Sequence, residues 1–491
     1  MNTHSSPKRL IAVSNRLPIK VINKGKEKKV VPGEGGLVTA LAPVLRDRGG
    51  MWIGWSGAPH DPDLSGLLEK ASKEAGYHLK SVPLTEDDIR LYYHGFSNEI
   101  IWPLFHDLQT RCRFAPEYWY RYLEVNREFA RTIFATARPG DYIWVHDYHL
   151  MHVAKCLREF NAVHRIGFFL HIPFPPPDIF LKLPWRRKVL EALLNYDLLG
   201  FQTMRDKRHF LNSLYQLVPG IKVSGRGSLS SVSYRGRTLR VGAFPISIDY
   251  RSFDRDSATK KVADAAWYLH EALPERQVIL GVDRLDYTKG IPERLHAFKN
   301  ALERDSELLG NVSLVQVVVP SREEVPEYQE LKAEIERLVG EINGRFTRSG
   351  WVPIHYLYRS LDRTELLAYY RLAEIALITP LKDGMNLVAK EYCACNHDGK
   401  GVLILSEFAG AAAQLHRGAI MVNPYDVEGV SNAIIDAHNM PVDERIRRMK
   451  LLRRTVRRKD IFWWVNTFLK AAFAKDLNAF PIEIAEEYVP A

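Results

Sequence analysis

Two cations in the second half of the chain stand at a spacing that suits a diphosphate group. The stretch G-V-D-R-L-D-Y-T-K-G follows the apolar run Val278–Val282, which we expect to be a strand, and places Arg284 and Lys289 just beyond its end. Because fixed positive charges stabilise a developing anion, this pair could hold a leaving diphosphate without a metal ion. The alternative is a pair of surface salt bridges with the neighbouring Asp283 and Asp286.

A second polar turn offers two carboxylates. The apolar run Ile375–Thr379 leads into P-L-K-D-G-M-N-L-V-A-K-E, a short turn followed by a helical pattern. Asp383 could accept hydrogen bonds from sugar hydroxyls, and Glu391, two helical turns later, could bind a ribose diol. In the alternative interpretation Asp383 caps the helix, which is worth ~1 kcal/mol, and Glu391 lies on the surface.

In the first half, a carboxylate and an imidazole each follow a predicted strand. V-H-D-Y-H-L ends the run Tyr142–Val145, and F-F-L-H-I-P-F-P-P-P ends the next one, so Asp147 and His171 should approach one crevice. Such groups suit hydroxyl recognition or proton transfer, although a single histidine is more often buried and satisfied. A metal site built from His146, His149 and His171 is disfavoured, because no H-x-x-x-H or H-E-x-x-H helix occurs there.

The N-terminal region resembles a phosphate loop. S-N-R ends the first predicted strand at Arg16, and G-E-G-G-L, with Gly33, Gly35 and Gly36, precedes a helical pattern. Glycines permit a tight backbone, and amides at a helix N-terminus attract an anion. The spacing matches neither the dinucleotide fingerprint nor the Walker loop, so a plain turn is an equal alternative.

Residue types that bind sugar phosphates occur at three further positions. Tyr93 and Trp102 lie in Y-Y-H-G-F-S-N-E-I-I-W-P, and Arg322 lies in V-V-P-S-R-E-E. The planar fork of an arginine matches a phosphate dianion. The alternative is a set of core aromatics and an exposed arginine near a helix start, and the local sequence does not separate the two.

The elements that must position these residues alternate between short β-branched runs and amphipathic helical stretches. This order is typical of parallel sheets covered by helices on both faces, and it predicts an α/β fold. A long helix is expected over Glu117–Thr136. The predicted strands are Leu10–Val13, Trp52–Trp55, Tyr142–Val145, Arg165–Leu170 and Leu198–Gln202 in a first series, and Val278–Val282, Ser313–Val319, Ile375–Thr379, Val402–Leu405 and Ala419–Val422 in a second.

The connector Val218–Tyr250 separates the two series. It is rich in Gly and Ser and has no long apolar period, so we place a domain boundary near Phe244–Ile248. We expect one domain over residues 1–244, a second over 245–460, and a helical segment over 461–491 that could pack back on the N-terminal domain. Two doubly wound sheets bind ligands at the carboxyl ends of their strands, so the site should draw from both halves.

The charge of the chain favours an anionic partner. Its 68 Lys and Arg against 58 Asp and Glu give a formal net charge of +10. A basic stretch over residues 445–459 alternates with apolar residues at helical spacing, which favours the solvated face of an amphipathic helix over nucleic-acid binding. The four cysteines form no redox or disulfide pattern, and neither a signal core nor a run of ~18 apolar residues occurs. We therefore expect a cytoplasmic protein without metal, cofactor, membrane or nucleic-acid partner.

The ensemble of motifs resembles the trehalose-6-phosphate synthase family of retaining glycosyltransferases. The likeness spans nearly the whole chain and includes S-N-R, the glycine loop, W-I-G-W-S-G, F-S-N-E-I-I-W-P, H-D-Y-H-L, F-F-L-H-I-P-F-P, L-L-G-F-Q-T, R-L-D-Y-T-K-G, P-S-R-E-E-V-P-E-Y, D-G-M-N-L-V-A-K-E and S-E-F-A-G-A-A. It implies two Rossmann-like, doubly wound domains facing a central cleft, the GT-B arrangement.

The resemblance also implies roles for individual residues. The acceptor glucose 6-phosphate would be bound by Arg16, Tyr93, Trp102, Asp147 and Arg322. The nucleotide-sugar donor would be held by Gly35, Gly36, Arg284, Lys289, Leu361, Leu387, Val388 and Glu391. His171 and Asp383 would address the donor glucose and complete a catalytic group with Arg284 and Lys289. Leu361 stands where some relatives carry an aromatic residue, and the Lys-rich segment over 24–29 receives no role.

The reaction implied by the resemblance is transfer of glucose from a nucleotide glucose, in the first place UDP-glucose, to glucose 6-phosphate with retention. The product would be α,α-trehalose 6-phosphate. No carboxylate is clearly placed for a covalent intermediate, so a front-face mechanism is expected, in which the departing phosphate oxygen accepts the acceptor's proton. Expected partners are the two substrates, further copies of the chain, and a separate trehalose-6-phosphate phosphatase, because D-R-D-S-A at Asp254 lacks the D-x-D-x-[TV] pattern. The alternatives are a glucosylglycerol-phosphate synthase and a non-catalytic relative that senses a sugar phosphate.

Overall fold

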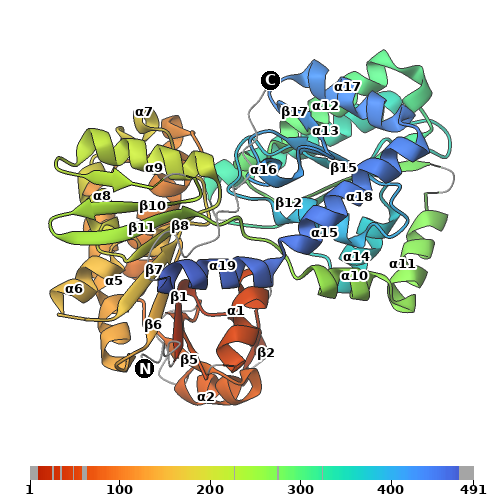
Figure 1. Cartoon of the computed structure of the whole chain (residues 1–491). Helices are drawn as coiled ribbons and strands as arrows, with labels where there is room; N and C mark the ends of the chain where they lie inside the picture. Colours follow the sequence, from red (N-terminus) through yellow and green to blue (C-terminus); the bar gives the residue numbers. More distant parts are fainter. Residues whose placement is uncertain are drawn as a thin grey trace. The chain divides into compact units, whose positions relative to one another are not determined.

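The chain folds into two compact α/β units (Figure 1). The computed structural model describes residues 9–24, 27–33, 36–47, 49–57, 64–225, 227–273, 276–322 and 325–474. The chain divides between Ile246 and Ser247, and the helix Ile461–Phe473 belongs with the first unit. Each unit contains a largely parallel sheet, as the sequence predicts. Within the described parts, no helix has the length and apolar character needed to cross a membrane.

The first unit is built on a nine-stranded sheet with the order β5-β4-β1-β6-β7-β8-β11-β10-β9. All neighbours from β5 to β11 in that order pair in parallel, and β9, β10 and β11 pair antiparallel. The strands predicted in this half are confirmed. These five are β1 (Leu10–Arg16), β4 (Met51–Trp55), β6 (Tyr142–His146), β7 (Arg165–Phe169) and β8 (Leu198–Phe201). The sheet also contains β5 (His78–Ser81), β9 (Lys222–Ser224), β10 (Leu229–Tyr234) and β11 (Arg237–Ala243), which were not predicted.

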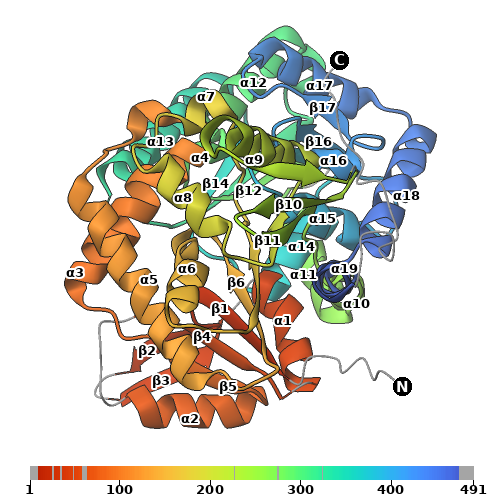
Figure 2. The ribbon, with the colours of Figure 1, turned by 60° about the vertical axis from the view of Figure 1, so that its left-hand side comes forward.

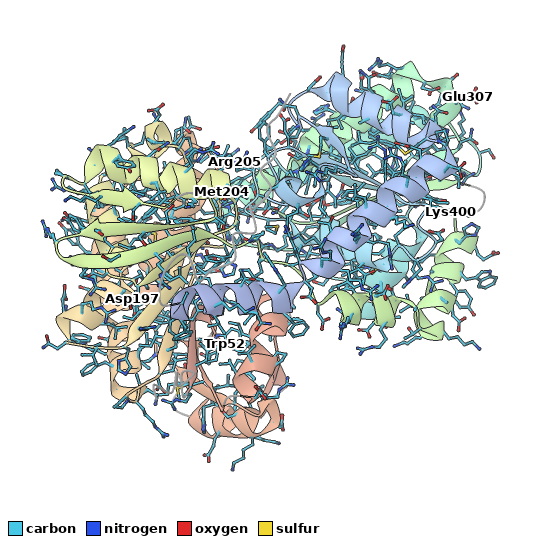
Figure 3. All side chains as sticks on the ribbon, viewed as in Figure 1. Trp52, Asp197, Met204, Arg205, Glu307 and Lys400 are labelled. Atoms are coloured by element: carbon cyan, nitrogen blue, oxygen red, sulfur yellow. The ribbon has the colours of Figure 1, made fainter. Side chains whose placement is uncertain are left out.

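Helices cover both faces of the first sheet, which is why its central strands are apolar on both sides. Residues 10–15 of β1 are buried without interruption, and so is Trp52 of β4 (Figure 3). The helices α1 (Gly36–Asp47) and α19 (Ile461–Phe473) lie side by side on one face, and α5 (Pro116–Thr136) and α6 (Val153–Glu159) cover the other (Figure 2). The predicted helix over Glu117–Thr136 is confirmed by α5.

Aromatic packing joins α19 to the first unit. The ring of Trp464 lies 5.1 Å from that of Trp144 on β6, and Phe468 stacks on Trp144 at 4.2 Å. The remaining helices of this unit are α2 (Leu64–Ala75), α3 (Glu86–Asp88), η1 (Ile89–Ile101), α4 (Trp102–Phe105), η2 (Gln109–Arg111), η3 (Tyr148–Leu150), α7 (Pro177–Phe180), α8 (Arg186–Leu193) and α9 (Met204–Leu217).

Some elements of the first unit were not predicted. The connector Val218–Tyr250, in which no strand was predicted, contains the three strands β9, β10 and β11. Val232 and Leu239 are buried there. The other positions of these strands include Ser, Thr and Arg, so the sequence shows no continuous apolar run. A hairpin of β2 (Ile19–Lys24) and β3 (Glu27–Pro32) forms a separate two-stranded sheet.

The second unit is built on a six-stranded parallel sheet with the order β14-β13-β12-β15-β16-β17. The five strands predicted in this half are confirmed, and β14 is an addition at one edge. The bounds are β12 (Gln277–Arg284), β13 (Val312–Val319), β14 (Ile354–Tyr358), β15 (Ile375–Ile378), β16 (Val402–Ser406) and β17 (Ile420–Val422).

Two groups of helices sandwich the second sheet (Figure 1). One group, with α12 packed between its neighbours, comprises α12 (Ile291–Arg304), α13 (Pro326–Phe346) and α17 (Val427–Asn439). The other comprises α10 (Tyr250–Ser257), α11 (Lys260–Glu271), α14 (Arg363–Leu372), α15 (Leu387–Cys395) and α18 (Val442–Arg458). The short helices η4 (Tyr287–Lys289), η5 (Ser306–Leu308) and α16 (Ala412–Leu415) complete the unit.

Candidate active site

The loop after β12 is closed by a glycine that no other residue could replace without strain. Gly290 has φ +62°, and a Cβ there would lie 2.4 Å from the carbonyl oxygen of Thr379. The amide of Leu381 donates to the carbonyl of Thr288 at 2.8 Å. These contacts fix the R-L-D-Y-T-K-G turn against the end of β15, and they bring Lys289 to the turn that carries Asp383.

Lys289 and Asp383 form an ion pair within the second unit. The Lys289 Nζ lies 2.6 Å from the Asp383 Oδ2, and the two side chains are only 13% and 16% exposed. Asp383 also accepts a hydrogen bond from the Asn386 amide at 3.3 Å. The alternative in which Lys289 pairs with Asp283 or Asp286 is wrong, because the nearest carboxylate partner comes from a different strand's turn.

Asp383 is not the cap of the following helix. Asn386 occupies that position with φ +75°, and its Oδ1 accepts a hydrogen bond from the Ala389 amide at 3.1 Å. The capping interpretation of Asp383 is therefore wrong. The carboxylate is held at the turn, beside the first residues of α15: its Oδ2 accepts from Lys289 and Asn386, and its Oδ1 accepts from the Met385 amide at 3.4 Å.

Arg284 ends β12 as an exposed side chain. It makes no hydrogen bond or ion pair to any part of the chain that the structure describes. Asp283, its partner in the alternative interpretation, pairs with Arg294 of α12 at 2.6 Å. The guanidinium of Arg284 is thus available to an anion at the carboxyl edge of the sheet.

Arg294 is a residue that the sequence did not reveal. Its side chain is fully buried and donates to Asp283 Oδ2 at 2.6 Å, to Gln316 Oε1 and Thr379 Oγ1 at 3.0 Å, and to the Lys289 carbonyl at 3.4 Å. It thereby joins the ends of β12 and β15 and the middle of β13 to the Lys289 turn. A helical arginine carries no local sign of burial, so only the fold could identify it.

Arg322 lies in the second unit beside the same turn. Its guanidinium donates to the hydroxyl of Tyr328, which in turn donates to Asp286 Oδ2 at 3.4 Å. Burial raises the pKa of Asp286, but the charges of Arg322, Lys289 and Arg284 outweigh it and hold that pKa below its ordinary value. Three cations around one buried carboxylate leave a net positive region, which suits phosphate groups.

Glu391 is half-buried on α15 and is not exposed on the surface. Its Oε2 accepts a hydrogen bond from the hydroxyl of Tyr370 at 2.8 Å, and burial raises the pKa of the carboxyl group. Leu387 and Val388 occupy the first turn of the same helix and are half-buried, as is Leu361 before α14. The surface alternative for Glu391 is therefore wrong.

In the first unit, Asp147 and His171 lie next to each other after adjacent strands, as predicted. Asp147 has φ +77°, and its Oδ1 accepts from the amides of Tyr148 at 3.0 Å and of His171 at 3.2 Å. Burial raises the pKa of Asp147 to about 7, although these backbone donors lower it. The carboxyl group can therefore gain or lose a proton near neutral pH.

His171 is held neutral. Burial lowers the pKa of His171 to about 3, and its Nε2 lies 3.2 Å from the Nδ1 of His146. The ring of Trp464 of α19 lies 6.2 Å from the His171 ring. A neutral imidazole in this setting is suited to exchange hydrogen bonds with sugar hydroxyls and is poorly suited to carry a positive charge.

Arg16 is framed by aromatic rings. Its Cζ lies 4.7 Å from the ring centroid of Trp55 and 5.4 Å from that of Tyr93, which stacks on His149 at 5.9 Å. Trp55, in the W-I-G-W-S-G motif, was not assigned a role from the sequence. Cation–π contacts restrict the arginine and leave the edge of its guanidinium for a phosphate.

An unusual helix carries Tyr93. The segment Ile89–Ile101 is a π-helix of 13 residues, a form that is rare and often found at functional sites. Tyr92 of this helix donates to the Asn15 Oδ1 at 2.8 Å and so fixes it beside the end of β1. Trp102 follows directly, and its ring lies 6.0 Å from that of Tyr148.

The glycine loop is described only in part. Gly36 is the first residue of α1, whereas Gly35 and residues 25–26 of the Lys-rich segment lie outside the described residues. Across the described ranges, no group of three or more His, Cys, Asp or Glu residues is placed to hold a metal ion.

Comparison with known proteins decides the family. The model of "Glycosyltransferase family 20" matches residues 8–474. The chain belongs to this family. It is similar to a protein of Mycolicibacterium gilvum named trehalose-6-phosphate synthase, with 44% identity over 474 residues that cover 95% of this chain and 94% of that protein.

Solved structures of trehalose-phosphate synthases are also similar to this chain. One, described as trehalose-6-phosphate from E. coli bound with UDP-2-fluoro glucose, has a TM-score of 0.85 at 36% identity and covers 95% of this chain and 99% of that one. Another is an α,α-trehalose-phosphate synthase (UDP-forming) from Burkholderia xenovorans in complex with glucose-6-phosphate, with a TM-score of 0.84 at 34% identity, covering 94% of this chain and 99% of that one. The two-sheet fold of this chain is thus the GT-B type of its family.

Proposed function

We propose that the chain is a UDP-forming α,α-trehalose-phosphate synthase, which transfers glucose from UDP-glucose to glucose 6-phosphate with retention. The observation that carries the proposal is full-length similarity to synthases whose structures were solved with UDP-2-fluoro glucose and with glucose-6-phosphate. Anion-binding groups of the kind that both substrates need are present in each unit. The second unit has the turn that carries Arg284 and Lys289, here called the cationic turn, and the first has Arg16 between the rings of Trp55 and Tyr93, here called the Arg16 cage.

The donor is assigned to the second unit. Arg284 and Lys289 hold the diphosphate, Glu391 binds the ribose, and Asp383 binds hydroxyls of the donor glucose. Leu361, Leu387 and Val388 meet the base. Gly35 and Gly36, in the sequence of the first unit, are also assigned to the donor. The ion pair between Lys289 and Asp383 supports this assignment. It holds the Lys289 ammonium beside the carboxylate assigned to the donor glucose, where a donor phosphate can also bind it.

The acceptor is assigned to Arg16, Tyr93, Trp102 and Asp147 of the first unit and to Arg322 of the second. Arg16, Tyr93 and Arg322 take the phosphate, Trp102 packs on the sugar, and Asp147 accepts hydrogen bonds from acceptor hydroxyls. Arg16 is fixed by the rings of Trp55 and Tyr93, which reduces the entropy lost when it binds a phosphate.

The proposed chemistry is a front-face substitution. The bond between C1 of the donor glucose and the phosphate oxygen breaks, and its electron pair passes to the diphosphate, which Arg284 and Lys289 stabilise. The acceptor hydroxyl oxygen bonds to C1 on the same face, and its proton passes to the departing phosphate oxygen. His171 contributes a neutral imidazole to the donor glucose. UDP and trehalose 6-phosphate result, and the protein mainly positions both sugars.

A substrate panel tests the proposal. The purified chain is incubated with UDP-, ADP- or GDP-glucose and with glucose 6-phosphate or glycerol 3-phosphate, and nucleoside diphosphate release is measured. We expect fastest release with UDP-glucose and glucose 6-phosphate. Faster release with glycerol 3-phosphate would favour a glucosylglycerol-phosphate synthase, and no release from any pair would favour a non-catalytic sensor.

We propose that the chain does not remove the phosphate from trehalose 6-phosphate, and that a separate phosphatase does so later. We also propose that the chain assembles with further copies of itself. The same reactions, assayed for inorganic phosphate, should release none beyond a control without enzyme. Release of one phosphate for each UDP would contradict this. Light scattering of the purified chain would report whether it forms a homo-oligomer.

A further inference from the structure

The second unit has a basic hollow whose lining includes none of the residues assigned to substrates. It lies beside α18, near the loop that follows α15, and has a volume of about 400 Å³, the size of a small-ligand site. Lys400, labelled in Figure 3, directly follows the lining residue Gly399. The lining residues are Tyr250, His397, Gly399, Ile446, Lys450, Arg453, Arg454 and Arg457.

Three of the cations in the basic hollow have no partner. Lys450, Arg454 and Arg457 recur at helical spacing on one side of α18 and are exposed. None of them makes a hydrogen bond or ion pair with any described residue, and no lining residue is acidic. In the first turns of the same helix, by contrast, Arg447 and Arg448 both pair with Glu444. Unpaired like charges in one hollow raise the local concentration of anions.

The fourth cation connects the basic hollow to α15. Arg453 Nη1 donates to the carbonyls of Cys393, Ala394 and Asn396 at 3.1, 2.7 and 2.8 Å, and its Nη2 lies 2.7 Å from Asp254. A cation at this end of a helix stabilises it by its interaction with the helix dipole. The helix that Arg453 holds is the one that carries Glu391.

We propose that the basic hollow binds a small dianionic ligand of the phosphate-ester or pyrophosphate class and thereby changes the affinity of the enzyme for its donor. Lys450, Arg454 and Arg457 bind the anion, and Arg453 transmits its presence to the C-terminal end of α15. The binding site does not depend on the proposed function, whereas the effect on the donor rests on it. A concave site of this volume fits a small metabolite better than a nucleic acid, which calls for an extended basic surface.

A direct binding measurement tests the site. Inorganic pyrophosphate is titrated by calorimetry into the full chain in the presence of saturating UDP. Lys450→Gln/Arg454→Gln is compared with the matched control Arg447→Gln/Arg458→Gln, which removes the same charge from the same helix outside the lining. We expect the first variant to lose a binding step, or to weaken it by about tenfold or more, as the loss of two charge-assisted contacts should. The control should bind as the wild type does. Equal weakening in both variants, or no binding by the wild type, would overturn the site.

A kinetic measurement tests the coupling. The KM for UDP-glucose is measured with and without pyrophosphate, and we expect it to shift in the wild type and the control but not in Lys450→Gln/Arg454→Gln. Binding without any shift would overturn the coupling alone. Displacement of pyrophosphate by a single-stranded oligonucleotide at physiological salt would overturn the small-ligand assignment. Failure of the proposed function would show differently, as absent turnover of UDP-glucose with pyrophosphate binding intact.

Discussion

At the scale of single residues, the pairing of Lys289 with Asp383 leads to a prediction about the leaving group. Lys289→Ala should lower kcat/KM for UDP-glucose by about 10²–10³-fold, the usual cost of removing one preorganised group that stabilises a developing oxyanion. The rate of UDP release measures it. Lys299→Ala is the matched control, because Lys299 pairs with Glu341 on α13 and is not assigned to substrate. Wild-type turnover by Lys289→Ala with unchanged donor affinity would remove the lysine from the mechanism.

Asp147 makes the stability of the chain depend on pH. Burial raises its pKa in the folded protein to about 7, above its ordinary value of 3.8. Between these values the folded state holds a proton that the unfolded state has lost, so this carboxyl group stabilises the fold at low pH and loses that effect as pH rises toward 7. The melting temperature of wild type should therefore fall relative to that of Asp147→Asn between pH 5 and pH 8. Parallel curves for the two proteins would show that Asp147 has an ordinary pKa.

The residue pairings show what spacing alone can reveal. Asp147 and His171 follow neighbouring strands, so the sequence predicted that they lie close together, and their contact confirms it. Lys289 and Asp383 are 94 residues apart, and local spacing offered Asp283 and Asp286 as nearer partners. Asp283 pairs with the buried Arg294 and not with Lys289, and this pairing forms only in the folded sheet.

At the scale of elements, Arg294 is the side chain that joins the strand ends beneath the Lys289 turn. Arg294→Met should destabilise the second unit by ~3–5 kcal/mol, because it leaves the carboxylate of Asp283 buried without its partner. It should also raise the KM for UDP-glucose, because the Lys289 carbonyl loses a donor. Urea unfolding and initial rates measure the two effects.

The control for this substitution is Arg337→Met. Arg337 forms an exposed pair with Glu341 one helical turn away, so its loss should cost at most ~0.5 kcal/mol. If both substitutions cost the same, the buried pair does not hold the turn.

Elements were predictable where the apolar pattern was continuous. The central parallel strands, such as β1 and β12, are buried on both faces and so read as uninterrupted apolar runs. β14, with the sequence I-H-Y-L-Y, is an edge strand that is mostly half-buried, and it was missed. The π-helix of Ile89–Ile101 was missed because its period differs from that of an α-helix.

At the scale of the whole molecule, each unit carries a distinct set of chemical groups. The first has the Arg16 cage with Asp147 and His171, and the second has the cationic turn with Asp383 and Glu391. From the sequence, the helical segment after residue 460 could pack back on the first unit, but its apolar face alone did not require this. The fold assigns it to the first through Trp464 and Phe468, which pack on Trp144.

The anomeric configuration of the product tests the central claim most directly. The purified chain is incubated with UDP-glucose and glucose 6-phosphate, and the disaccharide is examined by NMR. The account predicts trehalose 6-phosphate in which both anomeric centres are α, formed in equal amount to UDP. A β configuration at the transferred glucose, a linkage to any other position, or release of free glucose in place of a disaccharide would contradict it.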